Sequence, residues 1–189
     1  MRTFLAIELP KEIKDNLREV QNNLKSKGPQ VKWVRSESIH LTLNFFGNIE
    51  ENSIDDIFHA VNTVVPGFNP FHLEVRGVGV FPNISRPRVI WAGIEFERGT
   101  LDILHKELNT QLNRIGFEPE KKEFTPHLTL GRVKTLKEKR QLIERIERMK
   151  GHNLGFFLVK NLFLFKSDLH PTGAVYTKLK TFDMAKPQT

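Results

Sequence analysis

Cysteine is absent from this chain of 189 residues, and no long apolar run interrupts its polar and charged residues. Without cysteine the protein can form no disulfide, no thiolate nucleophile and no cysteine-built zinc site, so nothing points to an oxidising compartment. The apolar stretch within residues 1–10 is too short for a signal peptide, and no segment approaches the length of a membrane span. These absences predict a cytoplasmic protein without membrane attachment.

Positive charge is in moderate excess. The 29 lysine and arginine residues outnumber 22 aspartate and glutamate residues, which gives a formal net charge of +7. Such a charge raises the local concentration of polyanions through long-range attraction and is compatible with an RNA or nucleotide partner. A moderate positive charge is equally typical of proteins in which it only aids solubility, so charge alone does not decide the function.

The chain carries two copies of one pattern at an offset of 87 residues. Periodicity predicts strands at about 2–8 and 88–96, each followed by an amphipathic helix. The first helix is expected over about 11–27 with Gly28 as its end, and the second is expected to stop near Gly116. Their apolar faces are Ile13, Leu17, Val20 and Leu24, and Leu101, Leu104, Leu108 and Leu112. Matching positions are Ile7 and Ile94, Glu8 and Glu95, Leu17 and Leu104, and His40 and His127.

Each copy continues with a second helix and a closing strand. Apolar residues at helical spacing predict the helices, with Ile54, Ile57, Phe58 and Val61 in the first copy and Leu142, Ile143, Ile146 and Met149 in the second. The closing strands, residues 71–75 and 156–160, resemble each other at an offset of 85, so the register has drifted by two residues. A duplicated strand-helix-strand-helix-strand unit predicts a bilobal α+β protein with a pseudo-twofold axis.

The whole chain, residues 1–189, is expected to form one domain. Its two lobes are predicted at roughly 1–82 and 88–175 plus a C-terminal strand, with terminal strands open to exchange between them. Between the lobes, residues 81–88 carry two prolines and several turn formers, which indicates a crossover loop rather than a flexible linker.

The chemistry lies in two identical tetrads, His40-Leu41-Thr42-Leu43 and His127-Leu128-Thr129-Leu130. Their alternation predicts half-buried strands, with His and Thr on one face and both leucines on the other. A single His-x-Thr is more often structural than catalytic, but a symmetry-related pair can bring two imidazoles to one site from opposite sides. In-line displacement at phosphorus needs this arrangement. With an unperturbed pKa near 6.5, one imidazole can act as base while the other acts as acid.

Three further side chains are candidates for holding the phosphate. The hydroxyl groups of Thr42 and Thr129 lie one pleat from each imidazole, where they can donate a hydrogen bond to a non-bridging oxygen. Arg132 offers the guanidinium that binds phosphate in bidentate fashion. On a regular strand Arg132 faces away from His127, so it reaches the site only if Gly131 permits a bulge; otherwise it is a solvated surface arginine. The arginine is not duplicated, because Phe45 occupies the equivalent position.

With these residues in view, the sequence resembles the two-histidine (HxTx) phosphoesterase superfamily, in particular its RNA 2',3'-cyclic phosphodiesterase or 2'-5' RNA ligase branch. The resemblance covers almost the whole chain and is carried by residues 2–7, Trp33-Val34, residues 40–47 and residues 124–133. It implies antiparallel sheets flanking a central cleft with helices outside, and metal-independent hydrolysis of RNA 2',3'-cyclic phosphate ends to 2'-phosphomonoesters. It also implies His40 as proton donor and His127 as proton acceptor. By microscopic reversibility the same residues can form a 2'-5' linkage.

The expected partner is RNA with a 2',3'-cyclic phosphate end, tRNA fragments included, with no cofactor, metal or obligate protein partner. Aromatic candidates for stacking on a terminal base are Phe4, Trp33, Phe45 and Phe46, of which Phe4 and Phe45 are preferred. The other five histidines are interpreted as structural or surface residues. A metal hydrolase is disfavoured because Glu37 and Glu123 do not share the histidine face. Two rival functions are a phosphodiesterase for a small cyclic nucleotide and a non-catalytic RNA-binding module.

Overall fold

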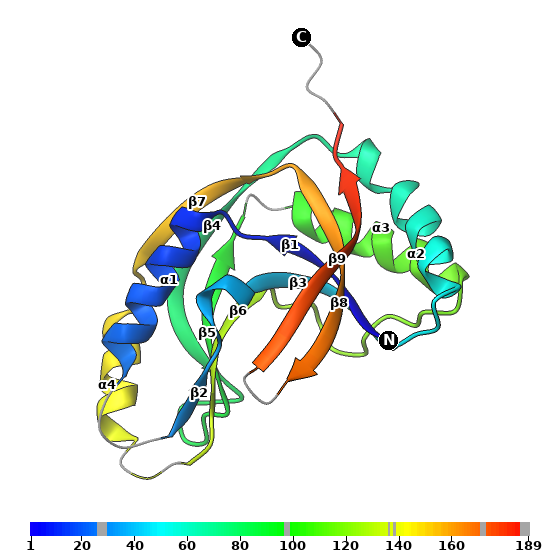
Figure 1. The fold of residues 1–189 in the computed structure, drawn as a ribbon. Coiled ribbons are helices and arrows are strands. Elements are labelled where there is room, and N and C mark those ends of the chain that lie inside the picture. The colour runs from blue at the N-terminus through cyan, green and yellow to red at the C-terminus, as the bar shows by residue number, and fades with distance from the viewer. Residues whose placement is uncertain (26–29, 97–98, 136, 138, 171–172, 186–189) are drawn as a thin grey trace.

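The computed structural model describes residues 1–25, 30–96, 99–135, 137, 139–170 and 173–185 (Figure 1). Its helices are α1 (Lys11–Leu24), α2 (Ser53–Asn62), α3 (Thr100–Arg114) and α4 (Arg140–Arg148), with short 3₁₀ turns η1 (Ser36–Ser38) and η2 (Val65–Gly67). Its strands are β1 (Arg2–Glu8), β2 (Val31–Trp33), β3 (His40–Asn48), β4 (Phe71–Phe81), β5 (Val89–Glu95), β6 (His127–Val133), β7 (Asn153–Val159), β8 (Asn161–His170) and β9 (Gly173–Asp183). The predicted α+β class is confirmed.

The strands form two antiparallel sheets, each assembled from both halves of the sequence. The first sheet has the order β3-β1-β8-β9, and the second has the order β2-β6-β5-β4-β7. The pairing of β1 with β3 in the first sheet is matched by the pairing of β5 with β6 in the second. The predicted division into lobes along the sequence stays a prediction, whereas the sheets themselves interleave strands from the two halves.

The closing strands differ from the expectation that they are equivalent. β7 lies directly beside β4 in the second sheet, where Leu73 pairs with Phe157. The strand next to β1 in the first sheet is β8, so β8 takes the place that β4 takes next to β5. Strand pairing depends on contacts between distant segments, and a local likeness between residues 71–75 and 156–160 does not reveal it.

The helices cover the two sheets in pairs. α1 contacts β7 and α4, and α4 contacts β4, so this pair covers the second sheet; α2 contacts α3 and β9, next to the first sheet. Figure 1 shows the pairs on opposite sides of the molecule. The first helix of each half therefore lies against a sheet other than the one that contains the strand before it, because β1 belongs to the first sheet and β5 to the second.

Apolar stripes predicted from the sequence form the core. Ile13, Leu17, Val20 and Leu24 on α1 are at most 3% exposed, and burying each contributes about 1.5–3 kcal/mol. α1 ends at Leu24, and the predicted stop at Gly28 lies outside the described residues. α3 ends at Arg114, close to the predicted stop, and Gly116 follows with a φ of 94°. A left-handed glycine at this point is the usual end of a helix.

The segment predicted as a crossover loop connects β4 to β5. These strands pair antiparallel up to Phe81 and Val89, so residues 82–88 close a hairpin within the second sheet. The Phe81-Pro82 peptide bond is cis. None of the helices in the described part of the chain is long and apolar enough to cross a membrane.

Candidate active site

The two tetrads occupy equivalent places at the starts of β3 and β6, and these strands contact each other where the two sheets meet. Leu41 and Leu128 are fully buried, whereas the histidines and threonines are half-buried. This is the alternation predicted from the sequence. Each sheet therefore presents one His-x-Thr pair on the face away from its leucines.

Both imidazoles are oriented by the same hydrogen bond. Nδ1 of His40 lies 2.9 Å from the carbonyl oxygen of Ser38, and Nδ1 of His127 lies 2.8 Å from that of Thr125. A carbonyl oxygen can only accept, so Nδ1 carries the proton in each ring. Nε2 is then the atom that exchanges protons with a substrate, and it can do so in either direction.

Aromatic rings surround His40. Phe4 stacks on the imidazole at a centroid distance of 4.5 Å, and Tyr176 approaches it edge-on at 5.1 Å. Burial lowers the pKa of His40 to about 4; the Ser38 hydrogen bond opposes this shift, and the positive charge of Lys14 adds to it. His40 is therefore neutral at pH 7 in the free protein.

His127 lies in a different setting. Phe81 meets its ring edge-on at 5.0 Å and itself lies 5.2 Å from Trp91. Trp91 stands 87 residues after Phe4, so each half places an aromatic residue at this point of the strand. The indole ring occupies space that Gly79 leaves free, because a Cβ at Gly79 would lie 2.3 Å from a ring carbon. The two histidines thus share an anchor but differ in their packing.

A β-bulge in β6 changes the face of the strand on which Arg132 lies. Trp91 pairs with Thr129 and Ile90 pairs with Gly131, which leaves Leu130 without a partner on β5. The extra residue reverses the alternation, and Arg132 follows it as an exposed residue. The positive charges of Arg2, Arg132 and Arg35 act on Tyr176, against the burial that raises the pKa of this phenol. Since Tyr176 touches His40, the positive charge of Arg132 also acts near the first tetrad.

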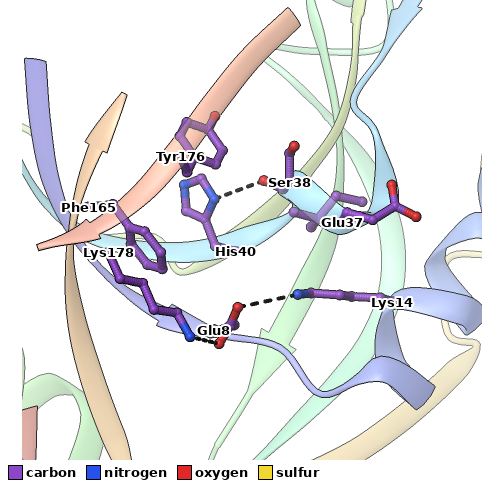
Figure 2. Close-up of a pocket in the computed structure, with 9 residues that line it drawn as sticks. Glu8, Lys14, Glu37, Ser38, His40, Phe165, Tyr176 and Lys178 are labelled. Carbon is purple, nitrogen blue, oxygen red and sulfur yellow. Dashed lines mark hydrogen bonds and ion pairs between the residues drawn. The ribbon is translucent and has the colours of Figure 1, made fainter. Parts of the chain in front are cut away.

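A pocket of about 310 Å³ opens beside His40 (Figure 2). Its wall contains Glu8, whose carboxylate lies 2.6 Å from Nζ of Lys178 and 3.6 Å from Nζ of Lys14. Ser38, Ile39, Glu37, Phe165 and Tyr176 complete the lining. The pocket combines aromatic surface with charged groups of both signs.

The aromatic candidates for base stacking lie in different places. Phe4 is 3% exposed between His40 and Phe165, so it has no free face for a base, and this expectation is corrected. Periodicity predicts the face on which Phe4 lies but not that Phe165 and Tyr176 cover it. Phe45 is 58% exposed and stays a candidate. Trp33 and Phe46 pack against the hydrophobic core.

Several side chains near the site escaped the sequence prediction. Tyr176, the only tyrosine of the chain, packs against His40, and Lys178 and Lys14 flank Glu8. Glu8 could have been selected from the sequence, since it matches Glu95 at the repeat offset. No sequence pattern identifies Tyr176 and Lys178, because their position near His40 depends on the pairing of β9 with β8 and of β8 with β1.

The remaining histidines do not join the site. His59, His72, His152 and His170 are exposed, whereas His105 is half-buried and hydrogen-bonded to the Leu43 carbonyl. Over the described ranges, no group of three or more His, Asp or Glu side chains is arranged to hold a metal ion.

Comparison with known proteins agrees with this geometry. The model of the LigT-like phosphoesterase family matches residues 7–91 and 95–176. The chain is 37% identical over 182 residues to the RNA 2',3'-cyclic phosphodiesterase of Methanothermobacter thermautotrophicus, with 96% of this chain and 98% of the relative covered. It is 37% identical over 180 residues to the protein of the same name from Thermotoga maritima, with 95% and 93% covered. The crystal structure of TT0787 from Thermus thermophilus has 31% identity and a TM-score of 0.83, with 100% of both chains covered. The chain therefore belongs to the LigT-like phosphoesterase family, as its paired tetrads predict.

Proposed function

We propose that the protein hydrolyses the 2',3'-cyclic phosphate at the end of an RNA to a 2'-phosphomonoester, with His40 as proton donor and His127 as proton acceptor. The observation that carries the proposal is the pair of identically anchored imidazoles on two strands in contact, each with Nδ1 bonded to a carbonyl oxygen. The curated relatives named RNA 2',3'-cyclic phosphodiesterase support the same substrate class.

In the proposed reaction, water attacks phosphorus opposite the 3' oxygen of the ribose. Nε2 of His127 takes a proton from the water as the new P–O bond forms. The bond between phosphorus and the 3' oxygen breaks, and Nε2 of His40 gives its proton to that oxygen. The hydroxyl groups of Thr42 and Thr129 and the guanidinium of Arg132 stabilise the charge that develops on the non-bridging oxygens.

The low pKa of His40 couples its proton to the substrate. With a pKa of about 4 the imidazole is neutral in the free protein at pH 7. A phosphodiester anion beside Nε2 favours the protonated form by direct attraction, an effect of about one to three pH units for close opposite charges. This shift brings the pKa of His40 to at most about 7 when the cyclic phosphate is bound, so the substrate raises the protonated fraction of His40 and thereby supplies the acid.

A different nucleophile gives a second activity of the same site. When the 5' hydroxyl of another RNA takes the place of water, His127 can deprotonate it and His40 can protonate the leaving 3' oxygen. The product is a 2'-5' linkage, and the balance between ligation and hydrolysis follows the concentration of 5' ends against water.

The terminal nucleoside is proposed to occupy the pocket beside His40, with Phe45 as a platform for a base. RNA, tRNA fragments included, is the preferred partner because the positive charges of Arg2, Arg35 and Arg132 act on Tyr176, which lines this pocket. A small cyclic nucleotide is the alternative substrate, since a pocket of about 310 Å³ holds little more than one nucleotide.

The test is an assay in the presence of EDTA, with an oligoribonucleotide that ends in a 2',3'-cyclic phosphate. We expect a product with a 2'-phosphate, and a loss of about 100-fold or more in rate for His127→Ala and for His40→Ala. His59→Ala, a change at an exposed histidine of α2, is the matched control and should keep the wild-type rate. Normal turnover by His127→Ala refutes the assignment, as does a 3'-phosphate product.

A further inference from the structure

Both tetrads end in a β-bulge at the same position of the repeat. On β3, Thr42 pairs with Ala6 and Asn44 with Leu5, which leaves Leu43 unpaired. On β6, Leu130 is left unpaired in the same way, 87 residues later. Both leucines are buried, at 5% and 0% exposure. A bulge interrupts the ladder, so a carbonyl group at this position can accept a hydrogen bond from a side chain outside the sheet.

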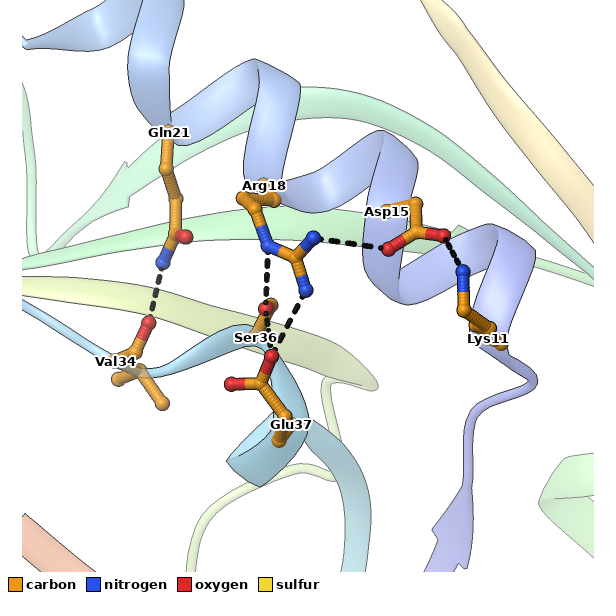
Figure 3. Close-up of polar contacts among 7 residues, drawn as sticks. All are labelled: Lys11, Asp15, Arg18, Gln21, Val34, Ser36 and Glu37. Carbon is orange, nitrogen blue, oxygen red and sulfur yellow. Dashed lines mark hydrogen bonds and ion pairs between the residues drawn. The ribbon is translucent and has the colours of Figure 1, made fainter.

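Gln21 of α1 supplies a donor for the second tetrad, and Figure 3 shows its other hydrogen bond, to Val34. Its side chain is 4% exposed, and Nε2 donates to the carbonyl oxygen of Leu130 at 2.8 Å and to that of Val34 at 2.7 Å. Val34 also donates its own N–H to the Leu130 carbonyl at 2.9 Å. Because Val34 begins the short segment that leads to His40, Gln21 ties the end of the second tetrad to the approach of the first.

His105 of α3 makes the corresponding contacts with the first tetrad. Its Nε2 lies 3.1 Å from the carbonyl oxygen of Leu43, and its ring stacks on Phe124 with centroids 3.8 Å apart and planes 15° apart. Phe124 immediately precedes Thr125, the residue whose carbonyl anchors His127. His105 therefore ties the end of the first tetrad to the approach of the second.

The state of His105 suits this contact. Burial lowers its pKa, so the ring is neutral, and the Leu43 carbonyl requires Nε2 to carry the proton. Nδ1 can then accept from Nδ2 of Asn109 at 3.4 Å, while Oδ1 of Asn109 accepts from Asn44 at 2.6 Å. Asn44 directly follows the first tetrad, so the network holds two consecutive residues of the bulge.

Arg18 strengthens the contact from α1. It stands 87 residues before His105, and its Nε donates to Oγ of Ser36 at 3.0 Å while Nη2 lies 2.8 Å from the carboxylate of Glu37. Figure 3 shows Arg18 and Gln21 reaching from one helix to the segment in front of His40. Equivalent helices of the two halves thus brace equivalent segments.

We infer that Gln21 and His105 are positioning residues that set the placement of the two catalytic imidazoles relative to each other. The inference rests on the proposed function. Each side chain connects the end of one tetrad to the segment that orients the other histidine, so loss of either contact moves one imidazole with respect to its partner. In-line transfer needs one Nε2 at the entering oxygen and the other at the leaving oxygen on the opposite side of phosphorus, and a displacement of about 1 Å can cost about 100-fold in rate.

The test measures kcat and KM on the oligoribonucleotide with a cyclic phosphate end, for Gln21→Leu and His105→Phe. Leucine removes the amide, and phenylalanine keeps a ring against Phe124 but removes the donor. We expect kcat to fall by about 10- to 100-fold, with KM changed less than about threefold. His105→Gln, which keeps a donor for the Leu43 carbonyl, should recover most of kcat.

Asn16→Leu is the matched control. Asn16 is also an α1 amide, and it donates to a strand carbonyl, that of Leu154 on β7, at 3.0 Å. This bond touches neither tetrad, so its loss should lower the unfolding temperature without lowering kcat. All variants are assayed well below their unfolding temperatures, and if His105→Phe does not fold, Gln21→Leu decides alone because the inference requires both residues.

A binding measurement separates positioning from general weakening. Uridine vanadate, a five-coordinate mimic of the transition state, should bind Gln21→Leu at least about tenfold more weakly, because it needs both imidazoles in line. Uridine 2'-phosphate, which resembles the product, should bind it within about threefold of wild type. An active wild-type protein whose Gln21→Leu variant keeps kcat, or loses no more than Asn16→Leu, overturns the inference. An inactive wild-type protein overturns the proposed function instead.

Discussion

The two imidazoles carry the same anchor, yet only one of them lies within a cluster of aromatic rings. Phe4 stacks on His40 and Tyr176 caps its edge, whereas His127 has Phe81 at its edge. Burial among these rings deprives an imidazolium of its hydration, which is why the pKa of His40 falls to about 4. Identical motifs therefore lie in different surroundings, and burial makes His40 depend on the substrate for its proton.

The buried His40 should make folding stability depend on pH. Its pKa is lowered from 6.5 to about 4, so between these values the unfolded chain binds a proton that the folded chain does not. The stabilisation is complete above pH 6.5 and is lost as the pH falls toward 4, by at most about 3 kcal/mol. We expect urea unfolding at pH 7 and pH 4.5 to reveal a larger loss of stability in the wild type than in His40→Phe. Equal losses in the two proteins would contradict the neutral state of His40.

At the scale of the element, the bulge in β6 decides whether Arg132 can serve the site. Gly131 pairs with Trp33 of β2. A Cβ at Gly131 would lie 2.7 Å from Val31 and 2.9 Å from the ring of Trp33. The absence of a side chain lets β2 pair with β6 next to the bulge. Glycine at this position is needed for space, and through the bulge it determines the direction of the next residue.

Gly131→Ala should therefore both destabilise the fold and impair substrate binding. The added methyl group forces β2 away from β6 at a cost of about 1–3 kcal/mol, and the shift should turn Arg132 from the phosphate. We expect a lower unfolding temperature and a KM raised several-fold, measured by calorimetry and by steady-state kinetics. Gly67→Ala, at a glycine with no atom within 4 Å of the added Cβ, is the control. A KM identical to wild type would show that Arg132 does not depend on the bulge.

The elements with strong periodicity could be predicted from the sequence, and the pairings between them could not. The leucine stripe of α3 and the alternation in both tetrads are local signals, and the structure confirms them. That β7 lies beside β4, and that β8 and β9 return to the first sheet, depends on contacts between distant segments. The sequence therefore predicted the histidines and threonines, but not that Tyr176 packs on His40. From the sequence, the bulge could be named only as a condition for Arg132 to reach the site.

At the scale of the molecule, each sheet contains strands from both halves of the sequence. The first sheet holds the tetrad of the first half together with β8 and β9 from the end of the chain. The second sheet holds the tetrad of the second half together with β2 and β4 from the first half. The hydrophobic core is continuous across both sheets. Neither half of the sequence contains all the strands of one sheet, so the relative placement of the two imidazoles depends on both halves.

The net charge of +7 makes a final prediction that separates RNA from a small nucleotide as the substrate. Binding of single-stranded nucleic acid weakens with salt, with a slope of log affinity against log salt of about −0.7 for each phosphate contacted. If Arg2, Arg35 and Arg132 around Tyr176 each contact a phosphate of RNA, kcat/KM for an oligoribonucleotide should fall with a slope near −2, about three times that value. Uridine 2',3'-cyclic phosphate, with a single phosphate, should give a slope no steeper than about −0.7. Arg35→Gln should make the oligoribonucleotide slope shallower by about 0.7, whereas Arg114→Gln on α3 should leave it unchanged. Equal slopes for the two substrates would favour the small cyclic nucleotide.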